Sequence, residues 1–362
     1  MEVSQIWFRL VRLYVKLGLF FYTKEIKVVG LKNVPKKGAV LFAINHPNGL
    51  IDPLIVTTNN PRASYFLVKA AAFKNPIIEK ILNSLNLIAI YRMRDGIDQL
   101  AKNEEVFNTC YDIFNRGKSL MIFPEGSDCR ERTVRPLSKG FTRIVYGAIE
   151  KYPDLQIQVV PVGLTYQNAS HFPCKVALHY GAPINASEIY ANNIPSKSIN
   201  ILKNEVANQL KELSVHIEKD ENYDTILTKL NDAQVDFTEV KKVQEMIKTN
   251  TFPPKKEGKT NYLKPLYYVI LLNSLVHYLI YKKQAKKNPD IDFVDTFRFT
   301  YNLFILPVFY ALQAFIVSYF FGDKIALLYF SFSLLIIFLY SKLAPTNTEA
   351  SSYKKNKPSN QV

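Results

Sequence analysis

The last third of the chain contains an uninterrupted apolar run that few folds can accommodate. Phe299–Gly322 is 24 residues long, lacks charged residues and is rich in Phe, Leu and Tyr. About 20 apolar residues in a helix cross a bilayer, so this run predicts a membrane span. After a Gly-Asp-Lys turn, Ile325–Ser341 adds 17 uncharged residues. The two runs together predict a transmembrane helical hairpin.

A third apolar segment, Pro265–Tyr281, leaves the number of spans open. It contains Asn273 and His277, which are costly at the centre of a bilayer. Lysine-rich stretches lie at Lys282–Lys287 and at Lys354–Lys357, and the positive-inside tendency places both in the cytoplasm. We therefore predict two spans, with Pro265–Tyr281 in the membrane interface.

The amino-terminal segment predicts an amphipathic helix that lies in a membrane interface. Arg9, Arg12 and Lys16 recur every three or four residues, so they form one basic stripe on a helix whose other positions are mostly apolar. Such cations face anionic headgroups. The alternative is a helix that packs on the protein's own core.

The charge balance fits an anionic partner. The 362 residues include 46 Lys and Arg against 31 Asp and Glu, a formal net charge of +15, which suits nucleic acid, phosphorylated substrates or a membrane surface. We predict no nucleic-acid partner, because the chain has a membrane hairpin and no recognition motif. Three cysteines without a CxxC pair and histidines without ligand spacing predict no metal and no resident cofactor.

Between these ends, residues 26–190 alternate apolar or β-branched runs with helix-like stretches. This alternation predicts an α/β fold, a mixed sheet flanked by helices, with functional groups at the strand ends. The predicted strands are Ala39–Ile44, Tyr65–Val68, Leu87–Tyr91, Leu120–Phe123, Ile157–Leu164 and Val176–Tyr180. The predicted helices are Asp98–Arg116, Gly140–Tyr152, Ser198–Ile217 and Phe237–Lys248, the last two separated by an acidic linker, Glu218–Asp224.

The first group of polar residues follows the strand at Ala39–Ile44. His46 and Asp52 lie on either side of a turn that contains Pro and Gly. A carboxylate in contact with an imidazole fixes its tautomer, so that the other ring nitrogen can accept a proton. The pair is therefore a candidate catalytic site, and a purely structural pairing is the alternative.

A second group follows another apolar strand. Glu125, Gly126 and Ser127 come directly after it, and the cations beyond them include Lys139. A carboxylate beside glycine amides and cations can hold a polyol and bind its phosphate, so these four are candidate substrate-binding residues. Arg92, at the end of a third strand, is a fifth. Taken singly, three intervening arginines are predicted to be solvated loop residues: Arg130, Arg132 and Arg135.

The order His-x-Asp, strand–Arg, Phe-Pro-Glu-Gly and Val-Pro-Val-Gly resembles the four blocks of the glycerolipid acyltransferase superfamily, which includes the 1-acylglycerol-3-phosphate O-acyltransferases. The resemblance covers roughly residues 26–190. It implies that His46 is the general base, Asp52 its partner, and Pro161 a residue that shapes the pocket. It also implies that the acceptor's glycerol phosphate is bound by Arg92, Glu125 and Gly126.

The function implied by the resemblance is transfer of a fatty acyl group from acyl-CoA or acyl carrier protein to lysophosphatidic acid, which makes phosphatidic acid in phospholipid synthesis. The family has four residues between His and Asp, whereas this chain has five, and Gly49 can best absorb the extra one. The longer gap also resembles a branch that acylates glycerol 3-phosphate or dihydroxyacetone phosphate. A non-catalytic membrane-binding module is the alternative of another class.

The predicted organisation has five segments. They are an amphipathic interface helix (1–25), an acyltransferase domain (26–217), a helical linker region (218–263), a membrane segment (264–342) and a disordered basic tail (343–362). A thioester donor is made in the cytoplasm, so we expect an integral membrane protein whose catalytic domain faces that side.

Overall fold

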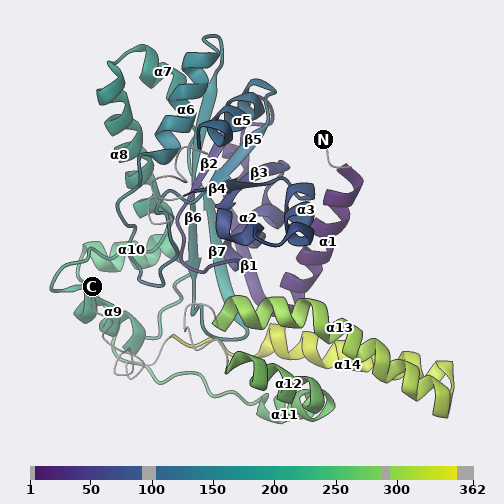
Figure 1. Cartoon of the computed structure of the whole chain (residues 1–362). Coiled ribbons are helices and arrows are strands. Elements are labelled where there is room, and N and C mark those ends of the chain that lie inside the picture. Colours follow the sequence, from purple (N-terminus) through teal and green to yellow (C-terminus); the bar gives the residue numbers. More distant parts are fainter. Residues whose placement is uncertain (1–4, 92–102, 287–293, 349–362) are drawn as a thin grey trace.

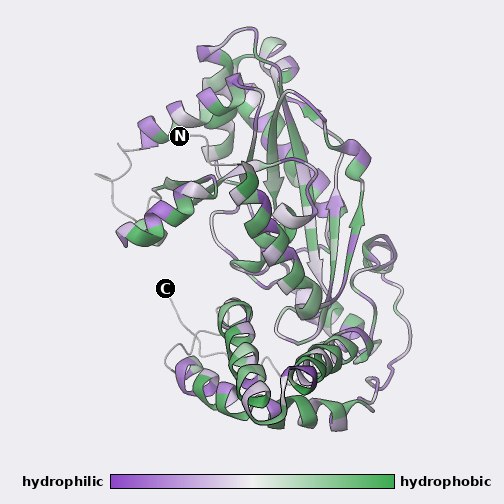
Figure 2. Ribbon diagram, turned by 90° about the vertical axis from the view of Figure 1, so that its right-hand side faces the viewer, coloured by the Kyte–Doolittle hydropathy of each residue, from purple (hydrophilic) through white to green (hydrophobic). Residues whose placement is uncertain are grey.

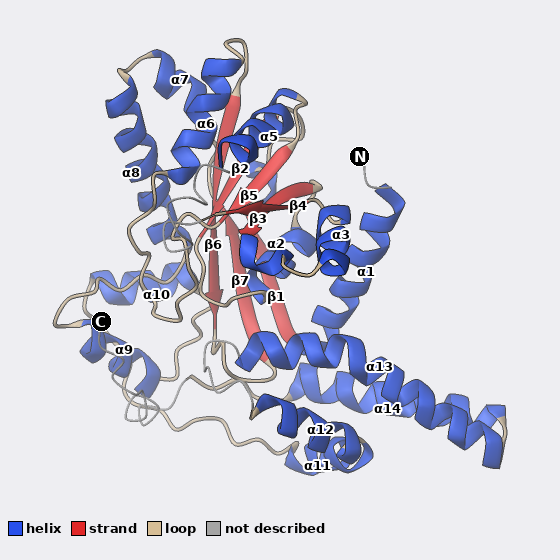
Figure 3. Ribbon diagram, viewed as in Figure 1, coloured by secondary structure: helices blue, strands red, loops and turns tan. Residues whose placement is uncertain are grey.

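The computed structural model describes residues 5–91, 103–286 and 294–348, and within them a sheet of eight strands forms the centre. Its order is β1-β7-β6-β2-β5-β3-β4, with β8 paired to β6. The strands are β1 (Thr23–Val29), β2 (Ala39–Ile44), β3 (Ser64–Lys69), β4 (Leu87–Ile90), β5 (Ser119–Ile122), β6 (Ile157–Tyr166), β7 (Cys174–Tyr180) and β8 (Ile184–Asn185). β6 runs antiparallel to β7 and β8, and the other pairs are parallel. The predicted mixed sheet flanked by helices is confirmed (Figure 3).

The middle strand, β2, explains where functional groups gather. All six of its residues are buried, as is typical of a strand that is covered on both faces. It pairs in parallel with β5 and with β6. The carboxyl ends of β2 and β5 therefore meet at one edge of the sheet, where the loops that carry His46 and Glu125 begin.

Helices cover both faces of the sheet (Figure 1). On one face, Phe114, Phe141 and Leu202 pack in the same cluster as Leu41 of β2. They belong to α5 (Asn103–Asn115), α6 (Gly140–Lys151) and α8 (Pro195–Leu213), which is preceded by the short α7 (Ala186–Ala191).

The other face is covered by α1 (Gln5–Tyr22), α2 (Ile51–Asn59) and the start of α13 (Val294–Phe321). Here Leu19, Ile55 and Phe299 pack in the same cluster as Phe42, the neighbour of Leu41 in β2. Successive strand side chains point to opposite faces, so β2 supplies both cores.

Helix α1 packs on the protein's own core with one face, and its predicted position in a membrane interface stays a prediction. Phe8, Leu19 and Tyr22 are buried, whereas the opposite face exposes mostly apolar side chains: Ile6, Leu10, Leu13, Leu17 and Phe20. The prediction that Arg12 points toward headgroups is wrong. Its guanidinium donates to the carbonyl of Asn60 at 2.6 Å, because the last carbonyls of α2 lack partners within their own helix.

Several elements differ from the prediction. The sequence pattern did not predict β1, β8, α2, α3 (Pro76–Ser84), α7 or the 3₁₀ turns Leu31–Asn33 and Ala70–Phe73. It also placed a linker where α9 (Tyr223–Asp232) begins, since the acidic residues there masked the apolar spacing of Tyr223, Leu227 and Leu230. The predicted helix Asp98–Arg116 starts outside the described residues, and its described part is α5.

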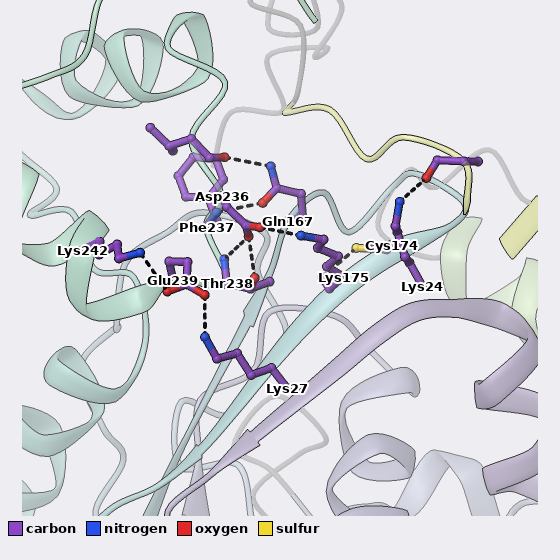
Figure 4. Close-up of polar contacts among 12 residues, drawn as sticks. Lys24, Lys27, Gln167, Cys174, Lys175, Asp236, Phe237, Thr238, Glu239 and Lys242 are labelled. Atoms are coloured by element: carbon purple, nitrogen blue, oxygen red, sulfur yellow. Dashed lines mark hydrogen bonds and ion pairs between the residues drawn. The ribbon is translucent and has the colours of Figure 1, made fainter. Parts of the chain in front are cut away.

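The region after α8 is tied to the sheet edge. Helices α9 and α10 (Val240–Lys248) share a third apolar cluster. Lys27 of β1 pairs with Glu239 and Lys175 of β7 pairs with Asp236, each at 2.5 Å (Figure 4). Gln167 accepts from the Phe237 backbone N–H at 2.8 Å. These contacts hold the region predicted to be a linker against β1 and β7.

The described residues of the apolar carboxyl-terminal part form four helices: α11 (Lys264–Asn273), α12 (Leu275–Ala285), α13 and α14 (Asp323–Leu343). In the part of the chain that the structure describes, α13 and α14 are long and apolar enough to cross a membrane, which agrees with the predicted hairpin. They run side by side away from the sheet (Figure 1), and their colouring is predominantly hydrophobic (Figure 2). Arg92, Lys287 and most of the predicted tail lie outside the described residues.

Candidate active site

The contact predicted between His46 and Asp52 is present. Nδ1 of His46 lies 2.8 Å from Oδ2 of Asp52. The carboxylate stands in the first turn of α2, where unpaired N–H groups and the helix dipole favour a negative charge. The imidazole is 16% exposed and the carboxylate 0%. The ring can therefore reach a substrate while its partner is shielded from water.

Two further donors hold the Asp52 carboxylate. The Asn48 backbone N–H donates to Oδ2 at 2.7 Å, and the Tyr166 hydroxyl donates to Oδ1 at 2.6 Å. Burial raises the pKa of Asp52, while its hydrogen bonds with His46, Tyr166 and Asn48 oppose the rise. Burial and the nearby carboxylate also raise the pKa of Tyr166, so its hydroxyl stays protonated and donates.

Tyr166 is a site residue that the sequence did not predict. Strands β2 and β6 are in parallel register with Ile44 opposite Val162. Tyr166 therefore lies at the same edge of the sheet as the loop after β2, where its side chain meets Asp52. A tyrosine at the end of an apolar strand resembles a core residue. The sequence feature that could have indicated its role is a polar hydroxyl at the end of β6, the strand that lies beside β2.

Asn45 fixes the start of the same loop and was not singled out either. Its Nδ2 donates to the Leu164 carbonyl at 3.0 Å, and its Oδ1 accepts from the Leu164 N–H at 2.7 Å. The side chain thereby pairs with the β6 backbone just beyond the end of β2. Because both amide groups are satisfied, the direction in which the chain enters the His46 loop is fixed.

Glu125 stands beside the histidine, as expected from the parallel pairing of β2 and β5. The Phe123 ring stacks on the His46 ring, with centroids 4.1 Å apart. Oε2 of Glu125 accepts from Nε of Arg135 at 2.7 Å. Burial raises the pKa of Glu125, and the Arg135 charge opposes the rise. The carboxylate is therefore held by a partner within the protein.

The other predicted substrate-binding residues do not gather beside Glu125 and His46 in one site. Gly126 has φ of +80°, a left-handed conformation that favours glycine. Ser127 Oγ accepts from Nη1 of Arg135 at 2.8 Å, and Lys139 precedes α6 with an exposed side chain. Arg92 lies outside the described residues.

The three arginines predicted to be solvated are bound to the protein instead. Arg135 bonds with Glu125 and Ser127 as described. Arg132 donates to two carbonyls at 3.0 Å each and lies 3.5 Å over the Phe237 ring. Arg130 donates to the Ser170 hydroxyl. The carbonyls of the last residue of β6 and of the residue after it accept from Arg132, so the loop folds onto the protein.

A pocket opens beside the histidine. Its lining includes His46, Pro47, Glu125, Arg132, Leu164 and Tyr166. Of the predicted substrate-binding residues that the structure describes, only Glu125 lines this pocket, and Pro161 is buried within β6. Across residues 5–91, 103–286 and 294–348, no group of three or more His, Cys, Asp or Glu side chains is placed to hold a metal ion.

Comparisons with known proteins point to acyl transfer. The profile of a family described as "Acyltransferase" matches residues 25–165. "Glycerol-3-phosphate O-acyltransferase 2" of Saccharomyces cerevisiae is 27% identical over 158 residues, which are 42% of this chain and 20% of that protein. The "Probable 1-acyl-sn-glycerol-3-phosphate acyltransferase" of Mycoplasma pneumoniae is 31% identical over 147 residues, 39% of this chain and 52% of that protein.

A crystal structure of the 1-acyl-sn-glycerophosphate (LPA) acyltransferase PlsC from Thermotoga maritima matches with a TM-score of 0.40 and 15% identity, over 56% of this chain and 80% of that one. The chain spans from a fifth to about half of the length of the two curated relatives above. The residues matched by the family profile include both the His46–Asp52 loop and Glu125. The chain therefore carries an acyltransferase domain, and its relatives support the resemblance to the glycerolipid acyltransferase superfamily that its sequence predicted.

Proposed function

We propose that this chain transfers a fatty acyl group from an acyl thioester to the hydroxyl of lysophosphatidic acid and so makes phosphatidic acid. The observation that carries the proposal is the pairing of His46 with Asp52 at 2.8 Å, with the imidazole in the wall of a pocket. Acyl-CoA and acyl carrier protein are the proposed donors. They are substrates, and the proposal includes no resident cofactor.

In the proposed reaction His46 is the general base. Asp52 accepts the hydrogen bond from Nδ1, so Nε2 carries the lone pair that takes the proton of the substrate hydroxyl. The hydroxyl oxygen attacks the thioester carbonyl. The new C–O bond forms, the C–S bond breaks, and the leaving thiolate receives the proton from His46. Asp52 stabilises the imidazolium in between, and no covalent acyl-enzyme is required.

The acceptor is proposed to bind through the turn after β5 and through Arg92. Glu125 is placed to accept from a glycerol hydroxyl, since it lines the same pocket as His46. Gly126 gives the turn its left-handed conformation, which exposes backbone amides to a ligand. The guanidinium of Arg92 would bind the phosphate.

Lysophosphatidic acid resides in membranes, and the surface of this chain suits that location. Helices α13 and α14 expose long apolar side chains along most of their length, and the exposed face of α1 is mostly apolar. We propose that α13 and α14 cross the bilayer, that α1 lies on its surface, and that the catalytic domain faces the cytoplasm.

The contacts of α11 and α12 favour a deeper position than the predicted interfacial one. Asn261, just before α11, donates to a tyrosine near the end of α14 at 3.2 Å. Asn273, at the end of α11, donates at 3.1 Å to Ser333 in the middle of α14. Tyr281 of α12 returns to stack on Phe297 in the first turn of α13, with centroids 5.7 Å apart.

A re-entrant pair accounts for these contacts. The ten residues of α11 rise about 15 Å, which is half of a hydrocarbon core of about 30 Å. We propose that α11 descends to the middle of the bilayer and α12 returns to the starting side. The lysines after Tyr281 and the domain would then share one side, which preserves the even number of spans.

Glycerol 3-phosphate is the second candidate acceptor. Five residues separate His46 from Asp52, a gap that resembles the branch acting on glycerol 3-phosphate, and one relative from yeast bears that name. A non-catalytic membrane module is disfavoured, because it would have no use for the assembled pair of His46 and Asp52 beside Glu125.

The test uses the full chain purified in detergent. It is incubated with acyl-CoA or acylated acyl carrier protein and with either lysophosphatidic acid or glycerol 3-phosphate, and the lipid product is measured by mass spectrometry. We expect phosphatidic acid from lysophosphatidic acid, with loss of activity in His46→Ala and none in the matched surface variant His171→Ala. Preference for glycerol 3-phosphate would replace the proposed acceptor, and absence of transfer to either would refute the proposed function.

A further inference from the structure

The first turn of α13 contacts the loop that carries the catalytic pair, although more than 240 positions separate the two in the sequence. Nδ2 of Asn48 donates to Oδ2 of Asp295 at 2.7 Å. The Leu50 N–H donates to Oγ1 of Thr296 at 3.2 Å. Asn48, Asp295 and Thr296 are all buried. The hydrogen bond between Asn48 and Asp295 is therefore shielded from water, so the loss of either partner would be costly.

Asp295 is itself held from the side opposite to the loop. Its Oδ1 accepts from the Tyr22 hydroxyl of α1 and from Nη2 of Arg298. Nε of Arg298 donates to the Tyr22 hydroxyl at 2.8 Å, and Nη1 donates to the Ser170 carbonyl at 3.2 Å. The Asp295 carboxylate is thus fixed to α1 and, through Arg298, to the segment after β6. Its other oxygen, Oδ2, faces the loop in one orientation.

Two further hydrogen bonds connect the Asp295–Asn48 contact to His46. The side chain of Asn48 is oriented by Asp295, and its backbone N–H donates to Oδ2 of Asp52 at 2.7 Å. The same oxygen contacts Nδ1 of His46 at 2.8 Å. A rotation of the Asn48 peptide would therefore remove one of the donors that hold the Asp52 carboxylate in line with the imidazole.

Gly49 connects the unusual length of the loop to the same helix. Its φ is +28°, and a Cβ at this position would lie 2.8 Å from Oγ1 of Thr296. Only glycine allows this approach of the loop to α13. Gly49 is also where the sequence predicts the extra residue between His46 and Asp52. The longer loop and the docked helix are thus parts of one arrangement.

We propose that Asp295 and Thr296 are positioning residues for acyl transfer, so that the beginning of the membrane hairpin completes the catalytic loop. The inference rests on the proposed function. It implies that residues 25–165, which the family profile matches, do not make a complete catalytic unit in this chain, because the His46 loop lacks two of its buried partners without α13.

Three variants of the full chain test the proposal. Asp295→Asn keeps the volume and removes the charge, Thr296→Val removes the hydroxyl, and Thr296→Ser restores it. We expect kcat to fall about ten- to a hundredfold in Asp295→Asn and about threefold to tenfold in Thr296→Val, with the KM of both substrates unchanged and near-normal kcat in Thr296→Ser. Asp323→Asn, at the start of α14 and far from the His46 loop, is the matched control and should behave as wild type.

A double-substitution experiment separates positioning from general destabilisation. If Asp295 acts through Asp52, then Asp295→Asn should add little loss to a chain that already carries Asp52→Asn. Equal losses in both backgrounds would overturn the proposal, and so would a wild-type kcat in Asp295→Asn.

Hydrogen exchange of the peptide that contains Asn48 and Leu50 gives a readout without acyl transfer. We expect faster exchange in Asp295→Asn and in Thr296→Val than in Asp323→Asn, since the loop amides lose their fixed partners. Unchanged exchange would overturn the positioning role. If the wild type transfers no acyl group, the proposed function fails, and this exchange measurement alone decides whether α13 orders the loop.

Discussion

Replacement of Tyr166 by Phe removes a single hydroxyl that lies 2.6 Å from Oδ1 of the buried Asp52 carboxylate. A hydrogen bond to a charged group contributes about 1.5–3 kcal/mol, which corresponds to a fall of about ten- to a hundredfold in kcat if the contact matters most when the imidazolium forms. The KM of either substrate should change little, because Tyr166 holds the carboxylate behind His46.

The same variant should change the pH dependence. The hydrogen bond from Tyr166 lowers the pKa of Asp52 against the effect of burial, so its loss lets that pKa rise. The carboxylate is active when ionised. The acid limb of the kcat profile should therefore move to higher pH, and activity should be lost earlier as the pH falls.

The assay is steady-state acyl transfer in detergent across a range of pH, with Tyr146→Phe as the control. Tyr146 is also buried, and its hydroxyl donates to the Ser198 carbonyl at 2.9 Å, in the core cluster that lies on the opposite face of the sheet from Tyr166. A kcat within twofold of wild type in Tyr166→Phe, or equal losses in both variants, would refute the assigned role of this hydroxyl.

Three further predictions address the base, the stability and the topology. His46→Ala should lower turnover by about 10²- to 10⁴-fold with an unchanged melting temperature, and near-normal turnover would contradict its role as base. Burial lowers the pKa of His179 below its ordinary value of 6.5, so the unfolded chain binds more protons in acid and stability should fall as the pH drops below about 6.5. Thermal unfolding between about pH 8 and pH 5.5 checks this, and His179→Gln should show a shallower dependence. Lys283→Cys should react with an impermeant thiol reagent from the side of the catalytic domain. The variant also carries Cys129→Ser, because Cys129 is the cysteine that is not buried. Labelling from the other side would establish that α11 and α12 cross the membrane.

The sequence by itself determined six of the eight described strands and the contact between His46 and Asp52. β2 is the predicted strand Ala39–Ile44 without a change of boundary, because an unbroken apolar run directly encodes burial on both faces. The pairing of His46 with Asp52 was also predictable, since both lie on one short loop. The order of the blocks was enough to predict an acyltransferase, in agreement with the family profile that matches residues 25–165.

Contacts between distant segments were decided only by the tertiary structure. Tyr166 meets Asp52 because β6 lies beside β2 with Ile44 opposite Val162, and neither the strand order nor the register can be deduced from local residue patterns. Arg135, which was predicted to be solvated, is paired with Glu125, because the loop after β5 folds back on its own beginning.

The start of α13 is the clearest case. In the sequence, Asp295 and Thr296 are two polar residues before an apolar run, and nothing near them indicates a partner. In the fold they meet Asn48 and Leu50, since Phe299 is buried against the sheet and draws the first turn of the helix onto the loop that carries His46. Apolar burial of this kind is non-directional. The apolar run therefore predicted that the helix would leave water, and only the packing of the whole chain decided that its first turn lies against the His46 loop.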